Sequence, residues 1–255
     1  MNYKVAIIGK GHVGSCMLEL FPDAYVYDEP LGIGTREEAN KCDIAFVCVP
    51  TPKIIPGGGC NTDIVFDVLE WLDTDVIVLR STIPVGFTDV MRLNLRKDII
   101  FMPEYYGETV AHPFANPHNR NWITLGGYEP ATTKVAELYQ SIFTSELIIN
   151  IVTPREAEMA KYMENSFFAT KVTFCNQFYD LCLAMNVDYN KVRETWLLDP
   201  RIGRSHTFVY PDNRGYGGSC LPKDTAAIIY QGDEFYTDMS LLKAVEKING
   251  GYHND

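Results

Sequence analysis

The sequence has no apolar run long enough to cross a membrane. Its longest apolar stretches, such as residues 44–49, fall far short of the roughly 20 residues that a membrane helix needs. The chain begins with a strand-like run followed by glycines, a pattern unlike a secretory signal. We therefore expect a protein with no membrane partner.

Basic residues are also few. The 22 lysines and arginines are outnumbered by 33 aspartates and glutamates, which gives a formal net charge of −11. Proteins that bind nucleic acids carry clustered positive charge against the phosphates. This acidic composition therefore predicts no nucleic-acid partner.

The cysteines form neither a disulfide framework nor a zinc motif. They number seven, an odd count, and neither their spacing nor that of the five histidines is typical of a metal site. Reduced thiols in a cytoplasmic protein that holds no metal are the simplest interpretation. The cysteines are Cys16, Cys42, Cys48, Cys60, Cys175, Cys182 and Cys220.

Short apolar runs alternate with helix-like segments through the first 152 residues. This alternation predicts an α/β fold, a Rossmann-like doubly wound parallel sheet with right-handed crossovers. Strands are expected at residues 3–9, 24–28, 44–49, 76–79, 99–102, 122–126 and 147–152. Helices are expected at residues 12–21, 35–41, 63–72, 84–96 and 130–142.

From Thr153 the sequence becomes helical in character. Thr153, Pro154 and Glu156 are typical of a helix start, and no Gly or Pro interrupts the segment up to about Met185. A helix of that length is expected to be a packing spine or a dimer interface. Shorter helices follow at 188–198, 223–231 and 238–249. The pattern divides the chain into an α/β domain, 1–152, and a helical domain with a long central helix, 153–255.

A glycine motif joins the first strand to the first helix. Gly9, Gly11 and Gly14 fit G-x-G-x-x-G, and Asp28 ends the next strand, 19 residues after Gly9. Such glycines admit a pyrophosphate to the helix N-terminus, and the aspartate accepts hydrogen bonds from the ribose. Asp28 is followed by Glu29, which favours NAD over NADP, although Arg36 lies nearby. The alternative is a turn that serves only helix–sheet packing.

A second glycine-rich segment, residues 215–224, reads Gly-Tyr-Gly-Gly-Ser-Cys-Leu-Pro-Lys-Asp. It places Cys220 between a tight turn and a helix start, with Lys223 close by. A thiol in that setting is expected to have a lowered pKa and to act as a nucleophile. With the dinucleotide motif, this indicates an oxidation that passes through a covalent thiol adduct.

Polar side chains follow the third, fourth and fifth predicted strands. Thr51, Thr82, Glu104 and Glu108 lie at the carboxyl ends of strands, where ligands bind in such sheets. The two glutamates could orient water or take a proton. The alternative is that the threonines cap helices and the glutamates are solvated surface groups.

The helical half adds further candidates. Lys161 and Asn165, four residues apart on the long helix, could together hold a substrate oxygen. Arg201, Arg204 and Arg214 could contact phosphate. The alternative for each of the five is ordinary surface polarity.

Taken in order along almost the whole chain, these motifs resemble the UDP-glucose/GDP-mannose dehydrogenase family of sugar-nucleotide dehydrogenases, and the run ending at Asp224 is the most specific. The resemblance implies a four-electron oxidation of a sugar C6 alcohol to a carboxylate, using two NAD⁺. Cys220 would form a thiohemiacetal and then a thioester. Lys161 and Asn165 would stabilise oxyanions, Asp224 would assist proton transfer with Lys161, and Glu104 and Thr82 would position water.

The resemblance also implies binding residues and a homodimer that forms through the long helix. The cofactor contacts would be Gly9, Gly11, His12, Val13, Gly14, Asp28, Thr51, Thr82, Glu108 and Lys223. The contacts with the nucleotide-sugar substrate would be Glu104, Tyr105, Tyr106, Glu108, Lys161, Asn165, Arg201, Tyr216 and Gly217.

The sequence departs from the family in two respects. Members usually carry a second Rossmann-like domain that covers the substrate nucleotide, whereas this chain stops at Asp255; it is expected to be a short form without that domain. Residues 205–213 also differ from the usual loop. Two alternatives therefore stay open: a two-electron dehydrogenase of a smaller hydroxy acid, and a non-catalytic NAD- or sugar-nucleotide-binding homologue.

Overall fold

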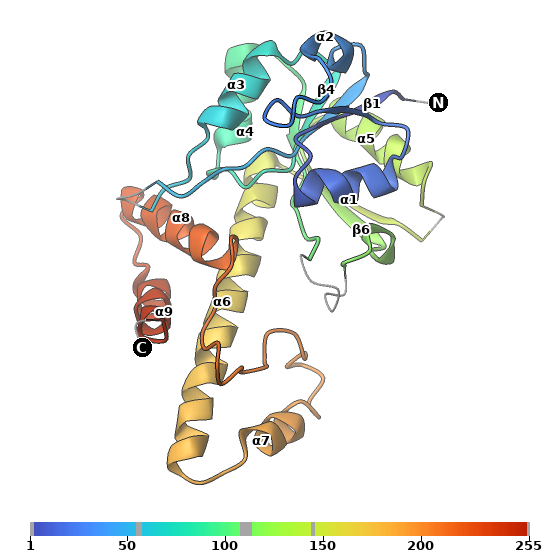
Figure 1. Ribbon diagram of the computed structural model, residues 1–255. Coiled ribbons are helices and arrows are strands. Elements are labelled where there is room, and N and C mark those ends of the chain that lie inside the picture. Colours follow the sequence, from blue (N-terminus) through green and yellow to red (C-terminus); the bar gives the residue numbers. More distant parts are fainter. Residues whose placement is uncertain (1–2, 55–57, 108–113, 144–145, 254–255) are drawn as a thin grey trace. The chain divides into compact units, whose positions relative to one another are not determined.

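The protein is described by a computed structural model that covers residues 3–54, 58–107, 114–143 and 146–253. The chain divides into two compact units (Figure 1). Unit 1 comprises Met1–Pro52 and Cys60–Lys161, and unit 2 comprises Lys53–Gly59 and Tyr162–Asp255. The division falls inside one long helix, and the domain limits expected from the sequence remain a prediction.

Unit 1 is built on a seven-stranded sheet with the order β2-β1-β3-β4-β5-β6-β7. The first five strands are parallel, and the strand order reverses between the neighbouring strands β1 and β3. This confirms the predicted Rossmann-like α/β fold. The strands are β1 (Val5–Ile8), β2 (Tyr25–Tyr27), β3 (Ile44–Val47), β4 (Val76–Leu79), β5 (Ile99–Phe101), β6 (Trp122–Gly126) and β7 (Ile148–Val152).

Helices cover both faces of this sheet, because the strands are apolar on both sides. Ile7, Phe46 and Val78 face a core completed by α1 (His12–Leu20) and α5 (Ala131–Gln140). The alternating residues, among them Ile8 and Val47, face a second core. That core is completed by α2 (Arg36–Ala39), α3 (Asp63–Trp71) and α4 (Phe87–Leu95) (Figure 1).

The expectation of an entirely parallel sheet is wrong at one pair of strands. β6 runs antiparallel to β5, and the two pair only through Phe101 and Gly126, the last residue of each strand. A parallel neighbour requires a crossover, usually a helix. Between β5 and β6 the only helical element that the structure describes is the single turn η1 (Pro117–Asn119), so the chain returns in the opposite direction. β7 then pairs parallel to β6.

The long helix α6 (Pro154–Ala184) begins as the sequence predicts. The Thr153 backbone N–H donates to Glu156 Oε2 at 2.8 Å, and the Glu156 N–H donates to Thr153 Oγ1 at 3.4 Å. This reciprocal pair is a capping box. Three further helices belong to unit 2: α7 (Tyr189–Trp196), α8 (Leu221–Glu234) and α9 (Ser240–Gly251).

A short segment between β3 and α3 belongs to unit 2, which the sequence did not indicate. In this segment Lys53 pairs with Glu246 of α9 at 3.7 Å. Gly58 lies against Ala226 of α8 so closely that a Cβ atom would come within 3.3 Å of the Ala226 carbonyl oxygen. The connection from β3 to α3 is therefore more than a surface loop of the sheet.

Within unit 1, a buried carboxylate joins α6 to the start of α4. Glu158 is fully buried, and its two oxygens accept the backbone N–H groups of Gly86 at 2.5 Å and of Thr88 at 3.0 Å. These donors lie at the N-terminus of α4, where a negative charge is favourable. Burial nevertheless raises the pKa of Glu158 above its ordinary value, although the hydrogen bonds from Thr88 and Gly86 oppose that shift.

We predict that Glu158→Ala lowers the free energy of unfolding by roughly 2–4 kcal/mol, because two buried N–H groups lose their acceptor. The pH dependence has a defined sign. A raised pKa means that the folded state binds more protons than the unfolded state, so wild-type stability falls as pH rises from the ordinary value of 4.5 through the folded pKa. The unfolding free energy of wild type minus that of Glu158→Gln should therefore be largest at acidic pH and decrease as the pH rises towards neutrality. Urea unfolding across that range would measure it, and a difference that grows with pH would contradict this account.

Candidate active site

The glycine turn after β1 contains glycines of two kinds. Gly9 has φ +93°, and a Cβ atom on Gly14 would come within 1.9 Å of the Gly9 carbonyl oxygen, so the fold itself requires both. Gly11 is exposed, and a Cβ atom there would meet nothing within 4 Å. Packing therefore does not require glycine at 11. The free space lies at the N-terminus of α1, where a pyrophosphate would bind.

Asp28 lies beside this turn. Its carboxylate accepts the Lys10 backbone N–H at 2.7 Å and the Leu31 N–H at 3.0 Å. The nearby Arg36 is paired with Glu29 at 3.2 Å and lies over the Trp71 ring. Because its charge is already paired, Arg36 is poorly placed to select a 2′-phosphate, which favours NAD. The predicted contacts His12 and Val13 are the first two residues of α1.

The loops after β3 and β4 are held together by Cys60, for which the sequence predicted no role in the site. The Cys60 thiol donates to the carbonyl oxygen of Thr82 at 3.2 Å and to that of Thr51 at 3.9 Å. The Ser81 hydroxyl donates to the Val49 carbonyl at 2.6 Å. The two predicted threonines thus lie close together at the carboxyl edge of the sheet.

Glu104 and Lys161 are brought together after β5. The Lys161 ammonium donates to the Glu104 carbonyl oxygen. The Glu104 carboxylate accepts from the Arg80 guanidinium and from the Tyr106 backbone N–H. The Tyr105 ring lies 5.0 Å from the Lys161 nitrogen. Arg80 was not predicted, since it reads as the end of an apolar strand. Glu108, by contrast, lies outside the described residues.

Cys220 is the exposed thiol among the seven cysteines, none of which forms a disulfide bond. It is the N-cap residue of α8, and its sulfur lies 3.5 Å from the Ser219 hydroxyl. Burial raises the pKa of Cys16 to about 11 and that of Cys48 to about 12, which makes these thiols poor nucleophiles. Accessibility and position therefore distinguish Cys220.

Asp224 lies one turn along α8 from Cys220 and is 1% exposed. Its carboxylate accepts the Asn165 side-chain amide at 2.5 Å and the Lys223 ammonium at 2.6 Å. This network joins the first turn of α8 to α6 within unit 2. Lys223, predicted to contact the cofactor, is thus paired with Asp224.

The remaining predicted substrate residues differ in exposure. The Arg201 side chain is 86% exposed and forms an ion pair with Asp199 at 2.5 Å. Tyr216 is buried, and its backbone exchanges two hydrogen bonds with the Asn249 side chain, at 2.7 and 2.9 Å. A Cβ atom on Gly217 would meet nothing within 4 Å, so the backbone there is open to a ligand.

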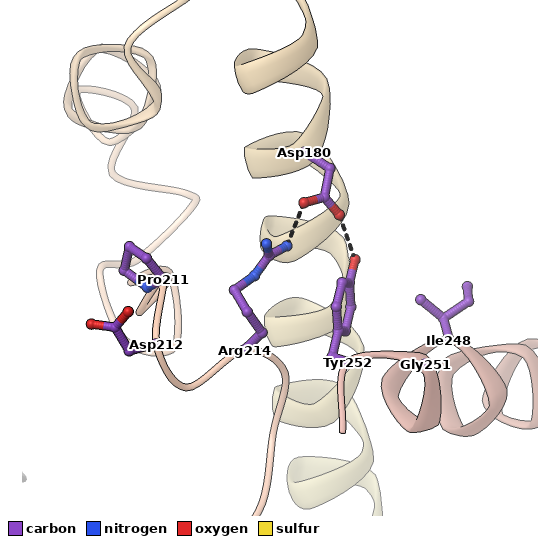
Figure 2. A pocket seen from close by; sticks show the side chains of 7 residues that line it. All are labelled: Asp180, Pro211, Asp212, Arg214, Ile248, Gly251 and Tyr252. Carbon is purple, nitrogen blue, oxygen red and sulfur yellow. Dashed lines mark hydrogen bonds and ion pairs between the residues drawn. The ribbon is translucent and has the colours of Figure 1, made fainter. Parts of the chain in front are cut away.

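Unit 2 also contains a pocket of about 590 Å³ (Figure 2). Arg214 is its central cation and pairs with Asp180 at 2.7 Å, while the Tyr252 hydroxyl donates to the other Asp180 oxygen at 3.1 Å. None of the predicted catalytic residues lines it. The Arg204 guanidinium is likewise paired, with Glu194 at 2.6 Å. The lining residues are Asp180, Pro211, Asp212, Arg214, Ile248, Gly251 and Tyr252.

The described ranges, 3–54, 58–107, 114–143 and 146–253, contain neither a metal-binding cluster nor a membrane-spanning helix. No three His, Cys, Asp or Glu side chains there are arranged to hold a metal ion. No helix in the same ranges has the length and apolar character needed to cross a membrane.

The doubly wound sheet and the glycine turn with Asp28 define a dinucleotide-binding protein of the Rossmann class. Residues 24–143 match the NAD binding domain of the UDP-glucose/GDP-mannose dehydrogenase family, and residues 155–250 match its central domain. The chain belongs to this family, and NAD is the cofactor of the domain that it carries.

A UDP-glucose 6-dehydrogenase of Pseudomonas aeruginosa is 32% identical over 225 residues, which are 81% of this chain and 48% of the relative. The chain spans about half the length of the curated relatives that it matches. A UDP-glucose dehydrogenase structure from Pyrobaculum islandicum has a TM-score of 0.84 at 24% identity, over 98% of this chain and 68% of that one. A 3-hydroxyisobutyrate dehydrogenase from Mycobacterium tuberculosis has a TM-score of 0.73 at 14% identity, over 100% and 95%. At these identities the two structures show the fold.

The two kinds of glycine give a matched test of cofactor binding. We predict that Gly11→Ser, which keeps a good N-cap residue, changes the free energy of unfolding by less than about 0.5 kcal/mol. It should weaken NAD⁺ binding at least ten-fold, since the side chain would occupy the pyrophosphate position. Gly14→Ala should instead destabilise the protein by roughly 3 kcal/mol through the clash with Gly9. Calorimetric titration with NAD⁺ and urea unfolding would separate the two effects, and unchanged affinity in Gly11→Ser would contradict the interpretation of Gly11.

Proposed function

We propose that this chain catalyses an NAD-dependent, four-electron oxidation of the C6 alcohol of a nucleotide sugar to the uronic acid. The observation that carries the proposal is Cys220, an exposed thiol at the start of α8. The relatives of this chain that are named UDP-glucose 6-dehydrogenase support the substrate class. Because the chain spans half of those relatives, the activity and the substrate are proposals.

The proposed reaction has four steps. In each of the two oxidations C6 loses a hydride, for which bound NAD⁺ would be the acceptor, and its hydroxyl group loses a proton. The first leaves an aldehyde, and the Cys220 sulfur adds to its carbonyl carbon to give a thiohemiacetal. Loss of the second hydride gives a thioester. Water then forms a C–O bond, the C–S bond breaks, one proton returns to the sulfur, and the acid releases another to solvent.

The polar groups of both units suit these steps. Lys161 and Asn165 are donors that would stabilise oxygen as it becomes negative. Asp224, buried between Asn165 and Lys223, would assist proton transfer together with Lys161. Glu104 and Thr82 would position the water that hydrolyses the thioester. We propose binding roles for the other cofactor and substrate residues predicted from the sequence, Glu108 included.

We also propose a cytoplasmic location and a homodimer. Seven cysteines without a disulfide bond suit a reducing compartment. The part of α6 within unit 2 carries a stripe of apolar side chains that are 44% to 74% exposed. Such stripes are unusual on monomers and typical of helix–helix interfaces. The stripe consists of Met163, Phe167, Phe174, Phe178 and Leu181.

A second candidate is a two-electron dehydrogenase of a smaller hydroxy acid. The observation that favours it is the likeness of the whole fold to the 3-hydroxyisobutyrate dehydrogenase, 95% of which the chain covers. Such a reaction needs an alcohol, a hydride acceptor and a proton acceptor but no thiol. The exposure of Cys220 would then serve no chemistry.

We expect the purified chain, given NAD⁺ and a panel of UDP- and GDP-sugars, to form two NADH per sugar consumed. Cys220→Ser should lower acid formation by at least 10³-fold, because no thiohemiacetal can form. Cys42→Ser, which replaces a half-exposed thiol, is the control and should leave the rate unchanged. One NADH per molecule from a hydroxy acid, unaffected by Cys220→Ser, would favour the second candidate. NAD⁺ binding without turnover of any substrate would favour a non-catalytic homologue.

The dimer has its own test. We predict that the double variant Phe174→Ser/Phe178→Ser shifts a wild-type dimer to monomer in sedimentation velocity, because these two rings, whose centres lie 4.6 Å apart, form the centre of the stripe. Tyr236→Ser, which alters a side chain that is 98% exposed, is the matched control and should leave the dimer intact. A wild-type chain that sediments as a monomer at all concentrations would rule out this interface.

A further inference from the structure

Unit 1 contains a buried cluster in which cations and aromatic rings alternate around the Glu104 loop. Two guanidinium groups and one ammonium group take part, and each belongs to a residue that is less than 10% exposed. Buried charges destabilise a protein unless they are paired, so a cluster of three buried cations is expected to serve a function. Its members are Arg80, Arg120, Lys161, Tyr105, Tyr106, Trp122 and Glu104.

Arg80 is the residue of the cluster that holds the Glu104 carboxylate. Its side chain is 0% exposed, and one terminal nitrogen pairs with Glu104 Oε2. Its other nitrogens, Nε and Nη1, are buried and have no hydrogen-bond partner in the described part of the chain. The Tyr106 N–H holds the second Glu104 oxygen. Both oxygens are thus bound by donors, which favours one orientation of the carboxylate.

Arg120 has a different role in the same cluster. It is 3% exposed, and its guanidinium carbon lies 5.0 Å from the centre of the Trp122 ring, 5.2 Å from that of Tyr106 and 5.3 Å from that of Tyr105. Its Nη1 is buried and has no hydrogen-bond partner among the described residues. Arg120 therefore packs against the rings and forms no ion pair with a carboxylate among the described residues.

The charges within the cluster are unequal. Three cations, Arg80, Arg120 and Lys161, surround the single carboxylate of the cluster, Glu104. The two donors that hold this carboxylate, Arg80 and the Tyr106 N–H, leave it with lone pairs that can accept a further hydrogen bond.

We propose that Arg80 is a positioning residue for Glu104. It holds the carboxylate in one orientation, so that Glu104 orients the attacking water as a hydrogen-bond acceptor during thioester hydrolysis. The inference rests on the proposed function for its catalytic consequence. Its structural part, the coupling of Arg80 to Glu104, does not depend on turnover.

The kinetic test compares two buried arginines that both contact the Tyr106 ring. With the sugar that yields two NADH, Arg80→Met should slow hydrolysis at least 100-fold while both NADH of the first turnover still form as a burst. Arg80→Lys should restore part of the rate of hydrolysis, because it keeps a cation that can donate to Glu104. Arg120→Met, which leaves the Glu104 contacts intact, should hydrolyse the thioester at the wild-type rate.

Equal rates of hydrolysis in Arg80→Met and wild type would overturn the proposal, as would an equal loss of hydrolysis in Arg120→Met. If Arg80→Met does not fold, Arg80→Lys and Glu104→Gln provide the comparison: both should slow hydrolysis more than formation of the first NADH. Equal losses in the two steps would then refute a specific positioning role.

A stability cycle keeps failure of this proposal distinct from failure of the proposed function. The melting temperature of Arg80→Lys/Glu104→Gln should be higher than the two single variants predict additively, because the single changes break one buried pair. Strict additivity would overturn the coupling of Arg80 to Glu104. Coupling without turnover of any nucleotide sugar would instead overturn the proposed reaction and leave the Arg80–Glu104 pair standing.

Discussion

The arrangement of unit 1 depends on the first two turns of α6, which anchor charged side chains in the carboxyl edge of the sheet. Glu158 completes the N-terminus of α4, and one turn later Lys161 binds the loop that follows β5. Neither group would be stable in an apolar interior alone, so each requires the partner that it orders. The helix, the α4 terminus and the Glu104 loop therefore fix one another. Of the residues predicted to react, Glu104 and Lys161 themselves take part in these buried polar contacts.

The elements of the fold were largely predictable because the strands are apolar, short and separated by strong helix signals. The capping box at Thr153 shows why the start of α6 could be located from the sequence. The direction of β6 could not, since alternating apolarity does not distinguish a parallel from an antiparallel neighbour. The assignment of residues 53–59 to unit 2 also carries no local signal, because it depends on contacts with Glu246 and Ala226, which are distant in sequence.

For the candidate site, the sequence located the groups with distinctive chemistry but not the residues that support them. Cys220, Glu104 and Lys161 stood out because of their type and position. Arg80 did not, because a cation at the end of an apolar strand usually projects into solvent, and only the three-dimensional structure shows that it is buried against Glu104. The glycines show the same division. A motif cannot distinguish Gly14, which packing requires, from Gly11, where the space is open.

The path of residues 53–59 has a topological consequence. The chain passes between the units three times, after Pro52, after Gly59 and after Lys161, so the helix is only one of three covalent connections. Cleavage within α6 would leave the units joined through the two ends of this short segment. Neither unit corresponds to a continuous stretch of sequence, and a gene fragment ending at Lys161 would encode the segment without the helices that it packs against. The two units are thus interlaced along the chain, and truncation alone cannot separate them.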